Sequence, residues 1–206
     1  MLIYGIQESG NCYKPCLLLA HLGGSYDWIE VDTQGGESRS EHFRRMNPHG
    51  KTPVLELDDG RHLFESNAIL CYLADGTPWL PQDRYQRART LAWMFFEQNS
   101  LETPIGAPHH WRVVMKDSAR HAEEFARRSP QGVASLTTME RYLADSDWFG
   151  GERMTVADIA LYGFAHVAGE AGYDMMSFPR TQAWLARAAA QPRHLPMERM
   201  GQGLAG

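Results

Sequence analysis

The sequence changes its pattern across residues 75–84, and this change constrains the fold more than any other feature. Before it, short apolar runs alternate with helical patterns, whereas after it apolar residues recur only at helical spacing. The segment itself contains one glycine, two prolines and no hydrophobic periodicity, which is typical of a linker. The sequence therefore predicts three parts: an α/β domain over residues 1–75, a linker over 76–84 and an all-helical domain over 85–206.

The first 75 residues contain four extended and three helical patterns. Pro15 fits the first turn of a helix that would end at Gly23, and Asp59-Gly60 between two extended runs is a hairpin signal. The order is therefore βαβαββα, an α/β sheet with one hairpin. The predicted strands cover residues 2–6, 26–32, 54–57 and 62–64, and the predicted helices cover 15–20, 38–46 and 66–74.

The rest of the chain is predicted to form a helical bundle. Thr155 as helix cap, with Asp158 three residues later, predicts a capping box in a shortened form. Pro130 is expected to kink or interrupt a long helical segment, because it lacks a backbone donor. The glycine-rich end, Gly201–Gly206, is expected to be a loose tail.

Charge and composition exclude several classes of protein. The 206 residues include 20 Lys and Arg against 25 Asp and Glu, so a net charge of −5 offers no overall attraction to nucleic acid or to an anionic membrane. No segment approaches the roughly 18 apolar residues of a membrane helix. The three cysteines, Cys12, Cys16 and Cys71, suit buried thiols in a reducing compartment. We expect a cytoplasmic protein without a disulfide framework.

A polar loop, Glu8–Asn11, follows the first predicted strand and precedes the first predicted helix. Open α/β sheets bind ligands at this position, and the helix N-terminus together with a Ser9 hydroxyl would stabilise a bound thiolate. Lowering a thiol pKa by two units needs only about 2.7 kcal/mol. Ser9 and Asn11 are also preferred helix caps, so the loop alone leaves a structural role open.

Two further segments could bind a small peptide. Lys51-Thr52-Pro53 enters a strand directly from a loop, and a cis bond before Pro53 would turn the Thr52 backbone outward to pair with an extended peptide, whereas a trans bond would make an ordinary turn. Glu65-Ser66 opens a helix, where the hydroxyl and the free amides suit a carboxylate and Glu65 suits an ammonium group. A plain capping role is equally compatible with the second segment.

Other polar and aromatic groups give weaker signals. The histidines, including His109-His110, lack the spacing of a metal site, so no metal is expected. Phe95 and Trp111 belong to an aromatic set that could line a core or a pocket.

Four segments, in order along nearly the whole chain, resemble the cytosolic glutathione transferases. No single segment is specific to this family, but the combination of all four at these separations is specific. The four segments are Ser9–Lys14, Asn47–Leu55, Glu65–Leu73 and Thr155–Ala160.

The resemblance implies a thioredoxin-like amino-terminal domain that holds glutathione as co-substrate, a helical domain with the pocket for an electrophile, and a homodimer. Ser9 takes the position of the catalytic hydroxyl, and Asn11 that of a functional asparagine in some bacterial members. The glutathione contacts implied are backbone bonds from Thr52 beside a cis Pro53, γ-glutamyl binding by Glu65 and Ser66, and neutralisation of the glycyl carboxylate by Lys51.

The departures from the family pattern indicate which class of glutathione transferase the chain resembles. Position 9 carries neither the tyrosine nor the cysteine of other classes, so the chain resembles a bacterial-type serine or asparagine enzyme. The electrophile pocket has no motif, and Phe95, His109 and Trp111 are expected there from polarity and region only. Disulfide reductase or peroxidase activity by the same thiolate, and a non-catalytic binding or interaction protein, are the alternatives.

Overall fold

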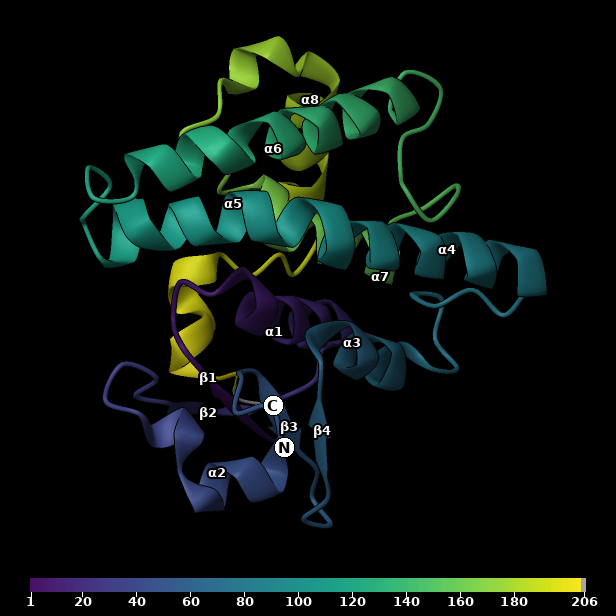
Figure 1. The fold of residues 1–206 in the computed structure, drawn as a ribbon. Coiled ribbons are helices and arrows are strands. Elements are labelled where there is room, and N and C mark those ends of the chain that lie inside the picture. The colour runs from purple at the N-terminus through teal and green to yellow at the C-terminus, as the bar shows by residue number, and fades with distance from the viewer. Residues whose placement is uncertain (205–206) are drawn as a thin grey trace. The chain divides into compact units, whose positions relative to one another are not determined.

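A computed structural model describes residues 1–204 of the chain (Figure 1). The contacts divide these residues into two compact units, one formed by residues 1–75 together with 192–204 and one formed by 76–191. The sequence pattern placed residues 192–204 in the helical domain, whereas in the structure they pack within the first unit. No helix among the described residues is both long enough and apolar enough to cross a membrane.

A mixed four-stranded sheet, in the order β2-β1-β3-β4, forms the centre of the first unit. The strands are β1 (Leu2–Gly5), β2 (Asp27–Glu30), β3 (Val54–Glu56) and β4 (His62–Phe64). β1 pairs parallel with β2 and antiparallel with β3, and β4 closes the hairpin with β3. The helices are α1 (Gly10–Leu22), α2 (Glu41–Met46), preceded by a 3-10 turn over Glu37–Arg39, and α3 (Ser66–Ala74).

The strands and helices occur in the predicted order, βαβαββα, and the thioredoxin-like fold is confirmed. Helices α1 and α3 pack against each other on one face of the sheet, while α2 lies on the other (Figure 1). On the α2 face, Phe43 and Met46 pack with Val54 and Tyr4. The alternation of strand side chains therefore supplies both faces with apolar contacts.

Helix α1 begins earlier than the sequence predicted. It starts at Gly10 and contains Pro15 in its interior, so the assignment of Pro15 to the first turn was wrong. The reason is the cap: the Ser9 side-chain oxygen accepts a hydrogen bond from the Cys12 amide at 3.3 Å, which starts the helix immediately after Ser9. The end at Gly23 is as expected, with a left-handed φ of 71°.

The named elements of the second unit are all helices or helical turns. From Arg84 to Val114 the chain runs through α4 (Arg84–Phe96), a π-helical turn (Glu97–Leu101), α5 (Glu102–His109) and a second π-helical turn (His110–Val114). After it come α6 (Ala122–Tyr142), α7 (Val156–Ala165), a 3-10 turn (Met175–Ser177) and α8 (Pro179–Ala189). The predicted helical domain is confirmed.

The prolines inside these helices do not break them. Of the two expected effects of Pro130, a kink or an interruption, the interruption does not occur, because Pro130 lies within α6, which is continuous from residue 122 to 142. The Ala126 carbonyl, which an amide at position 130 would have bonded, instead accepts from the Ser129 hydroxyl. In the same way the Tyr173 hydroxyl bonds the Pro104 carbonyl, four residues before Pro108, at 2.7 Å. Side chains thus replace the missing backbone donors.

The segment after residue 191 is anchored to the first unit. A 3-10 helix (Met197–Gln202) lies against α1 and β2, the Tyr26 hydroxyl donates to the Met200 carbonyl at 2.8 Å, and Leu204 pairs with the Tyr26 backbone. The expectation of a loose tail was therefore wrong for residues 201–204. The buried Met200 side chain and these contacts hold this segment against the first unit. Residues 205–206 lie outside the described part.

Candidate glutathione site

The start of α1 presents a partly exposed serine. The Ser9 oxygen already accepts the Cys12 amide, but a hydroxyl also carries one proton to donate. Ser9 is only partly buried, and it lies at the positive end of the 13-residue α1. This helix start can therefore stabilise an anion through both the Ser9 hydroxyl and the positive end of the helix dipole.

A buried thiol lies between two of the predicted site residues. The Cys12 side chain is fully buried, and burial raises its pKa, while hydrogen bonding with the Ser9 and Thr52 side chains acts in the opposite direction and is weaker. The same thiol therefore brings Ser9 and Thr52 together, although they are 43 positions apart in the sequence. Cys16 is also buried with a raised pKa, as expected for an inert thiol.

Asn11 joins the start of α1 to the start of α3. Its Oδ1 accepts from Lys14 Nζ and from Ser66 Oγ, each at 2.9 Å. An ammonium group has no acceptor, so the carboxamide oxygen must face Lys14, and the Nδ2 donors point the other way. The structure thus brings Asn11 and Ser66 into direct contact.

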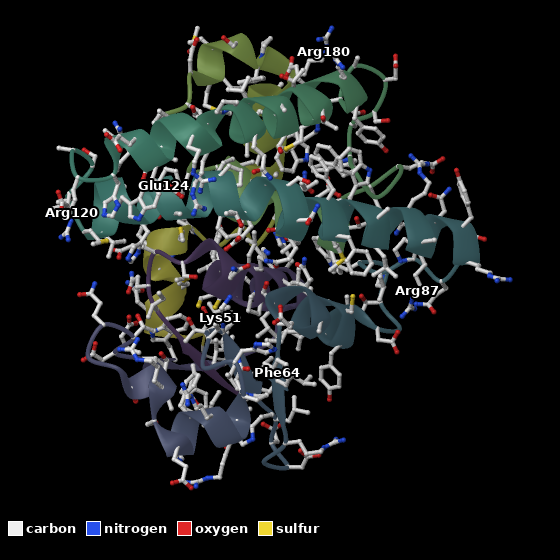
Figure 2. All side chains as sticks on the ribbon, in the orientation of Figure 1. Lys51, Phe64, Arg87, Arg120, Glu124 and Arg180 are labelled. Atoms are coloured by element: carbon white, nitrogen blue, oxygen red, sulfur yellow. The ribbon has the colours of Figure 1, made fainter. Side chains whose placement is uncertain are left out.

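The loop before β3 is held by a buried amide. Asn47 donates from Nδ2 to the Lys51 carbonyl at 2.7 Å and accepts from the His49 amide at 3.0 Å. The loop ends in a cis bond between Thr52 and Pro53, the isomer that the sequence left open. The Lys51 side chain is exposed and belongs to the same unit as α1 and α3 (Figure 2). Asn47 is a site-shaping residue that sequence reasoning did not single out.

The two serine-bearing helix starts share an unusual backbone. Glu8 and Glu65 have φ values of 67° and 66°, and each immediately precedes a serine, Ser9 or Ser66. A positive φ in a non-glycine residue costs on the order of 1 kcal/mol and tends to occur at functional sites. Glu65 is exposed whereas Ser66 is buried, so the carboxylate is free to meet a ligand while the hydroxyl is held in place.

The residues expected to line an electrophile pocket lie apart from one another. Phe95, on α4, is 71% exposed, whereas His109 is buried with its Nε2 3.2 Å from a Glu170 carboxylate oxygen. Trp111 stacks on His121 with 4.5 Å between ring centroids. Of the three, Trp111 lines a cavity of about 280 Å³, with Arg112 and Phe125 among its neighbours.

Sequence reasoning also gave no role to Lys14, which the structure places at the centre of the Asn11 and Ser66 contacts. Its position three residues after Asn11, on the same side of a helix start, is the signal that could have found it. Among residues 1–204, no three His, Cys, Asp or Glu side chains gather where they could hold a metal ion.

Comparison with known proteins assigns the family. The model of the glutathione S-transferase N-terminal domain matches residues 9–75, and that of the C-terminal domain matches 103–192. Disulfide-bond oxidoreductase YfcG of Escherichia coli K12 is 31% identical over 190 residues, covering 88% of this chain and 87% of YfcG.

Similar solved structures support the same family. A glutathione S-transferase from Pseudomonas fluorescens Pf-5 is 43% identical, with a TM-score of 0.92 over 95% of this chain and 98% of that one. Ure2p in complex with S-hexylglutathione is 25% identical, with a TM-score of 0.82 over 93% of this chain and 95% of that one. Family models match both parts of the sequence, and relatives above 30% identity extend over most of it, so the chain belongs to the glutathione S-transferase family.

Proposed function

We propose that this protein is a glutathione transferase that activates the thiol of glutathione and directs the thiolate at an electrophilic carbon. The observation that carries the proposal is the 2.9 Å bond between Asn11 and Ser66, which links the two helix starts suited to the two ends of the ligand's γ-glutamyl-cysteinyl part. Ure2p, which is similar to this chain, has been solved in complex with S-hexylglutathione, which supports a glutathione-type ligand.

Each part of the tripeptide has a complementary group. The Glu65 carboxylate pairs with the γ-glutamyl ammonium group, and the Ser66 hydroxyl with the amides at the start of α3 binds its carboxylate. The Thr52 backbone pairs with the cysteinyl unit, and Lys51 neutralises the glycyl carboxylate. Ser9, with Asn11 Nδ2 as its helper or rival, donates to the sulfur.

Catalysis follows from this positioning. The thiol proton leaves to solvent, the thiolate forms a bond to the electrophilic carbon, and the displaced group departs with the bonding electrons. A charged hydrogen bond from Ser9 or Asn11 and the field of α1 together supply roughly the 2.7 kcal/mol needed to lower the thiol pKa by two units.

Single substitutions test the roles of Ser9 and Asn11. We expect Ser9→Ala to lower kcat/KM for glutathione with a generic aryl halide about 100-fold, the loss of one charged hydrogen bond in the transition state. Ser25→Ala and Asn99→Ala, both at exposed positions, are matched controls that should leave the rate unchanged. If Ser9→Ala is active and Asn11→Ala is not, the asparagine rather than the hydroxyl stabilises the sulfur.

Disulfide reduction is the second candidate, favoured by the 31% identity with the oxidoreductase YfcG. The same thiolate would attack the glutathionyl sulfur of a mixed disulfide, forming oxidised glutathione and releasing the other thiol. Turnover of a mixed glutathione disulfide, compared with turnover of an aryl halide on the same preparation, separates the two activities. Glutathione binding without turnover of either would instead favour a non-catalytic role.

We also propose a cytoplasmic homodimer. On α4, Tyr85 and Phe95 are 67% and 71% exposed, and large exposed aromatic side chains favour a protein contact. The three cysteines form no disulfide among the described residues, in keeping with a reducing compartment. Analytical ultracentrifugation tests the dimer, and replacing both aromatics by glutamate should shift it to the monomer.

A further inference from the structure

The turn that precedes Ser9 has a strained residue at its centre. The Ser9 amide donates to the Ile6 carbonyl at 3.3 Å, which closes a four-residue turn between β1 and α1. Gln7 and Glu8 are its two central residues. Glu8 has a φ of 67°, in a place where turns of this kind prefer glycine. A strained residue persists only where surrounding contacts hold it, so the turn that places Ser9 must be held by other parts of the chain.

Gln7 holds this turn with two hydrogen bonds. Its backbone amide donates to Glu30 Oε1 at 3.1 Å, and its side-chain Nε2 donates to the Glu198 carbonyl at 2.9 Å. The other oxygen of Glu30 accepts from the Trp28 indole at 2.8 Å, so this carboxylate ties the turn to β2. Glu198 belongs to the 3-10 helix Met197–Gln202, which contacts α1 and β2 and is yellow in Figure 1. The turn is thus fixed both to the sheet and to a residue 191 positions further along the chain.

A glycine makes room for the Gln7 side chain. A Cβ atom added at Gly201 would lie 2.6 Å from Gln7 Oε1 and 3.5 Å from Trp28 Nε1, so a larger residue there would displace the Gln7 carboxamide. The bond to the Glu198 carbonyl needs that carboxamide in its present place, because only its nitrogen end can donate. The 3-10 helix is therefore shaped to receive Gln7.

We propose that Gln7 is a positioning residue that, with the 3-10 helix Met197–Gln202, holds Ser9 where its hydroxyl reaches the sulfur of glutathione. The inference rests on the proposed function, since it assumes that glutathione is the ligand and that Ser9 donates to its sulfur. The strength of a hydrogen bond depends steeply on distance and angle, so a small shift of the turn would weaken the bond to the thiolate. Gln7 acts through Ser9 and does not itself bind the ligand.

Asn11, the other candidate donor to the sulfur, does not depend on this turn. It lies within α1, and its Oδ1 accepts from Lys14 and from Ser66. Loss of the Gln7 side-chain contact should therefore move Ser9 and leave Asn11 in place. The pKa of the bound thiol then responds to Gln7 only if the Ser9 hydroxyl stabilises the sulfur.

The experiment measures the pKa of the glutathione thiol bound to wild type, Gln7→Met, Gly201→Ala and Gln82→Met, from the ultraviolet absorbance of the thiolate as the pH is raised. Methionine keeps the length of the side chain and removes both amide groups, and Gly201→Ala displaces the Gln7 carboxamide without changing Gln7. Gln82 is the matched control, because its Nε2 also donates to a main-chain carbonyl, that of Leu80, at 3.1 Å, but in the second unit. Thermal unfolding checks that each variant is folded.

We expect Gln7→Met to raise the pKa of the bound thiol by about one unit, half of the lowering ascribed to the start of α1, and Gly201→Ala to raise it as well. At about pH 6.5, kcat/KM with an aryl halide should fall about tenfold in Gln7→Met and recover as the pH rises above the new pKa. The Kd of S-methylglutathione, which has no thiol proton, should change less than about twofold, and Gln82→Met should match wild type throughout.

A purely structural role of Gln7 would lower the thermal stability without moving the pKa of the bound thiol. A wild-type pKa in folded Gln7→Met, or in Gly201→Ala if Gln7→Met does not fold, would therefore overturn the inference and leave the proposed function intact. If the wild-type protein binds no glutathione, or binds it without lowering the pKa of its thiol, both the inference and the proposed function fail.

Discussion

Polar side chains lie at the start of one helix in each unit, and the two helix starts differ in how many hydrogen bonds from the chain they accept. At the start of α7, Asp158 is fully buried, and its carboxylate accepts from the Phe149 and Thr155 amides, the Thr155 hydroxyl and the Trp184 indole. At the start of α1, Ser9 accepts a single amide and stays partly exposed. The first start is filled by the chain's own groups, while the second keeps donating capacity for a ligand. We infer that one stabilises the fold and the other binds.

The largest expected effect is on stability, at the filled helix start. Asp158→Ala removes an acceptor from four donors and leaves them buried, so we expect the free energy of unfolding to drop by about 4–5 kcal/mol. Chemical denaturation measures the loss. Asp83→Ala is the matched control, because Asp83 caps α4 from an exposed position and should cost only about 1 kcal/mol. Equal losses in both variants would contradict the comparison.

The second prediction is that acidification acts oppositely on the two units. In the first, burial lowers the pKa of His21 to about 4, from 6.5, so the unfolded chain binds the proton more readily and stability falls as the pH drops from 6.5 to 4. In the second, burial outweighs the hydrogen bonds and raises the pKa of Asp158 to about 6, from 3.8. There the folded chain binds the proton more readily, so stability falls as the pH rises from 3.8 to 6.

A variant of His21 isolates the pH effect in the first unit. His21→Gln should gain on the order of 2 kcal/mol relative to wild type between pH 6.5 and pH 4, since the glutamine carries no proton. Denaturation curves at the two pH values provide the measurement. A pH dependence identical to that of wild type would show that His21 is not the titrating group.

The smallest expected effect comes from relieving the backbone strain at Glu8 and Glu65, the two glutamates with positive φ. Glu65→Gly and Glu8→Gly should each stabilise the protein by about 1 kcal/mol, because glycine adopts a positive φ without strain. The two variants should differ in function, since only Glu65 is proposed to pair with the ligand ammonium group. We expect KM for glutathione to rise about tenfold in Glu65→Gly and to stay unchanged in Glu8→Gly. A rise in KM for both would mean that loop conformation, not the Glu65 carboxylate, governs binding.

The sequence predicted what depends on local pattern. The alternation of strands and helices, the hairpin at Asp59-Gly60 and the capping box at Thr155 and Asp158 all follow from neighbouring residues, and all are present. Pro130 does not interrupt α6, and periodicity does not reveal the hydrogen bond from the Ser129 hydroxyl to the Ala126 carbonyl beside it. Lys14 was missed because it contacts Ser66, which is 52 positions away in the sequence, and only the packing of α1 on α3 brings the two residues together.

The site residues show the same division. Ser9, Thr52 and Ser66 were predicted as members of three separate segments, each with a capping or turn role left open. Their convergence through Cys12 and Asn11 depends on tertiary contacts. The electrophile pocket had no local pattern at all, and the three residues expected there have quite different surroundings.

The most direct test of the account is the number of protons released when glutathione binds. Calorimetry at about pH 7.5, in buffers of different ionisation enthalpy, counts them, and S-methylglutathione, which has no thiol proton, is the control. If the open start of α1 lowers the thiol pKa by about two units, binding of glutathione should release most of one proton and binding of the control none. Tight binding of glutathione with no proton released would contradict the claim that this helix start stabilises a thiolate.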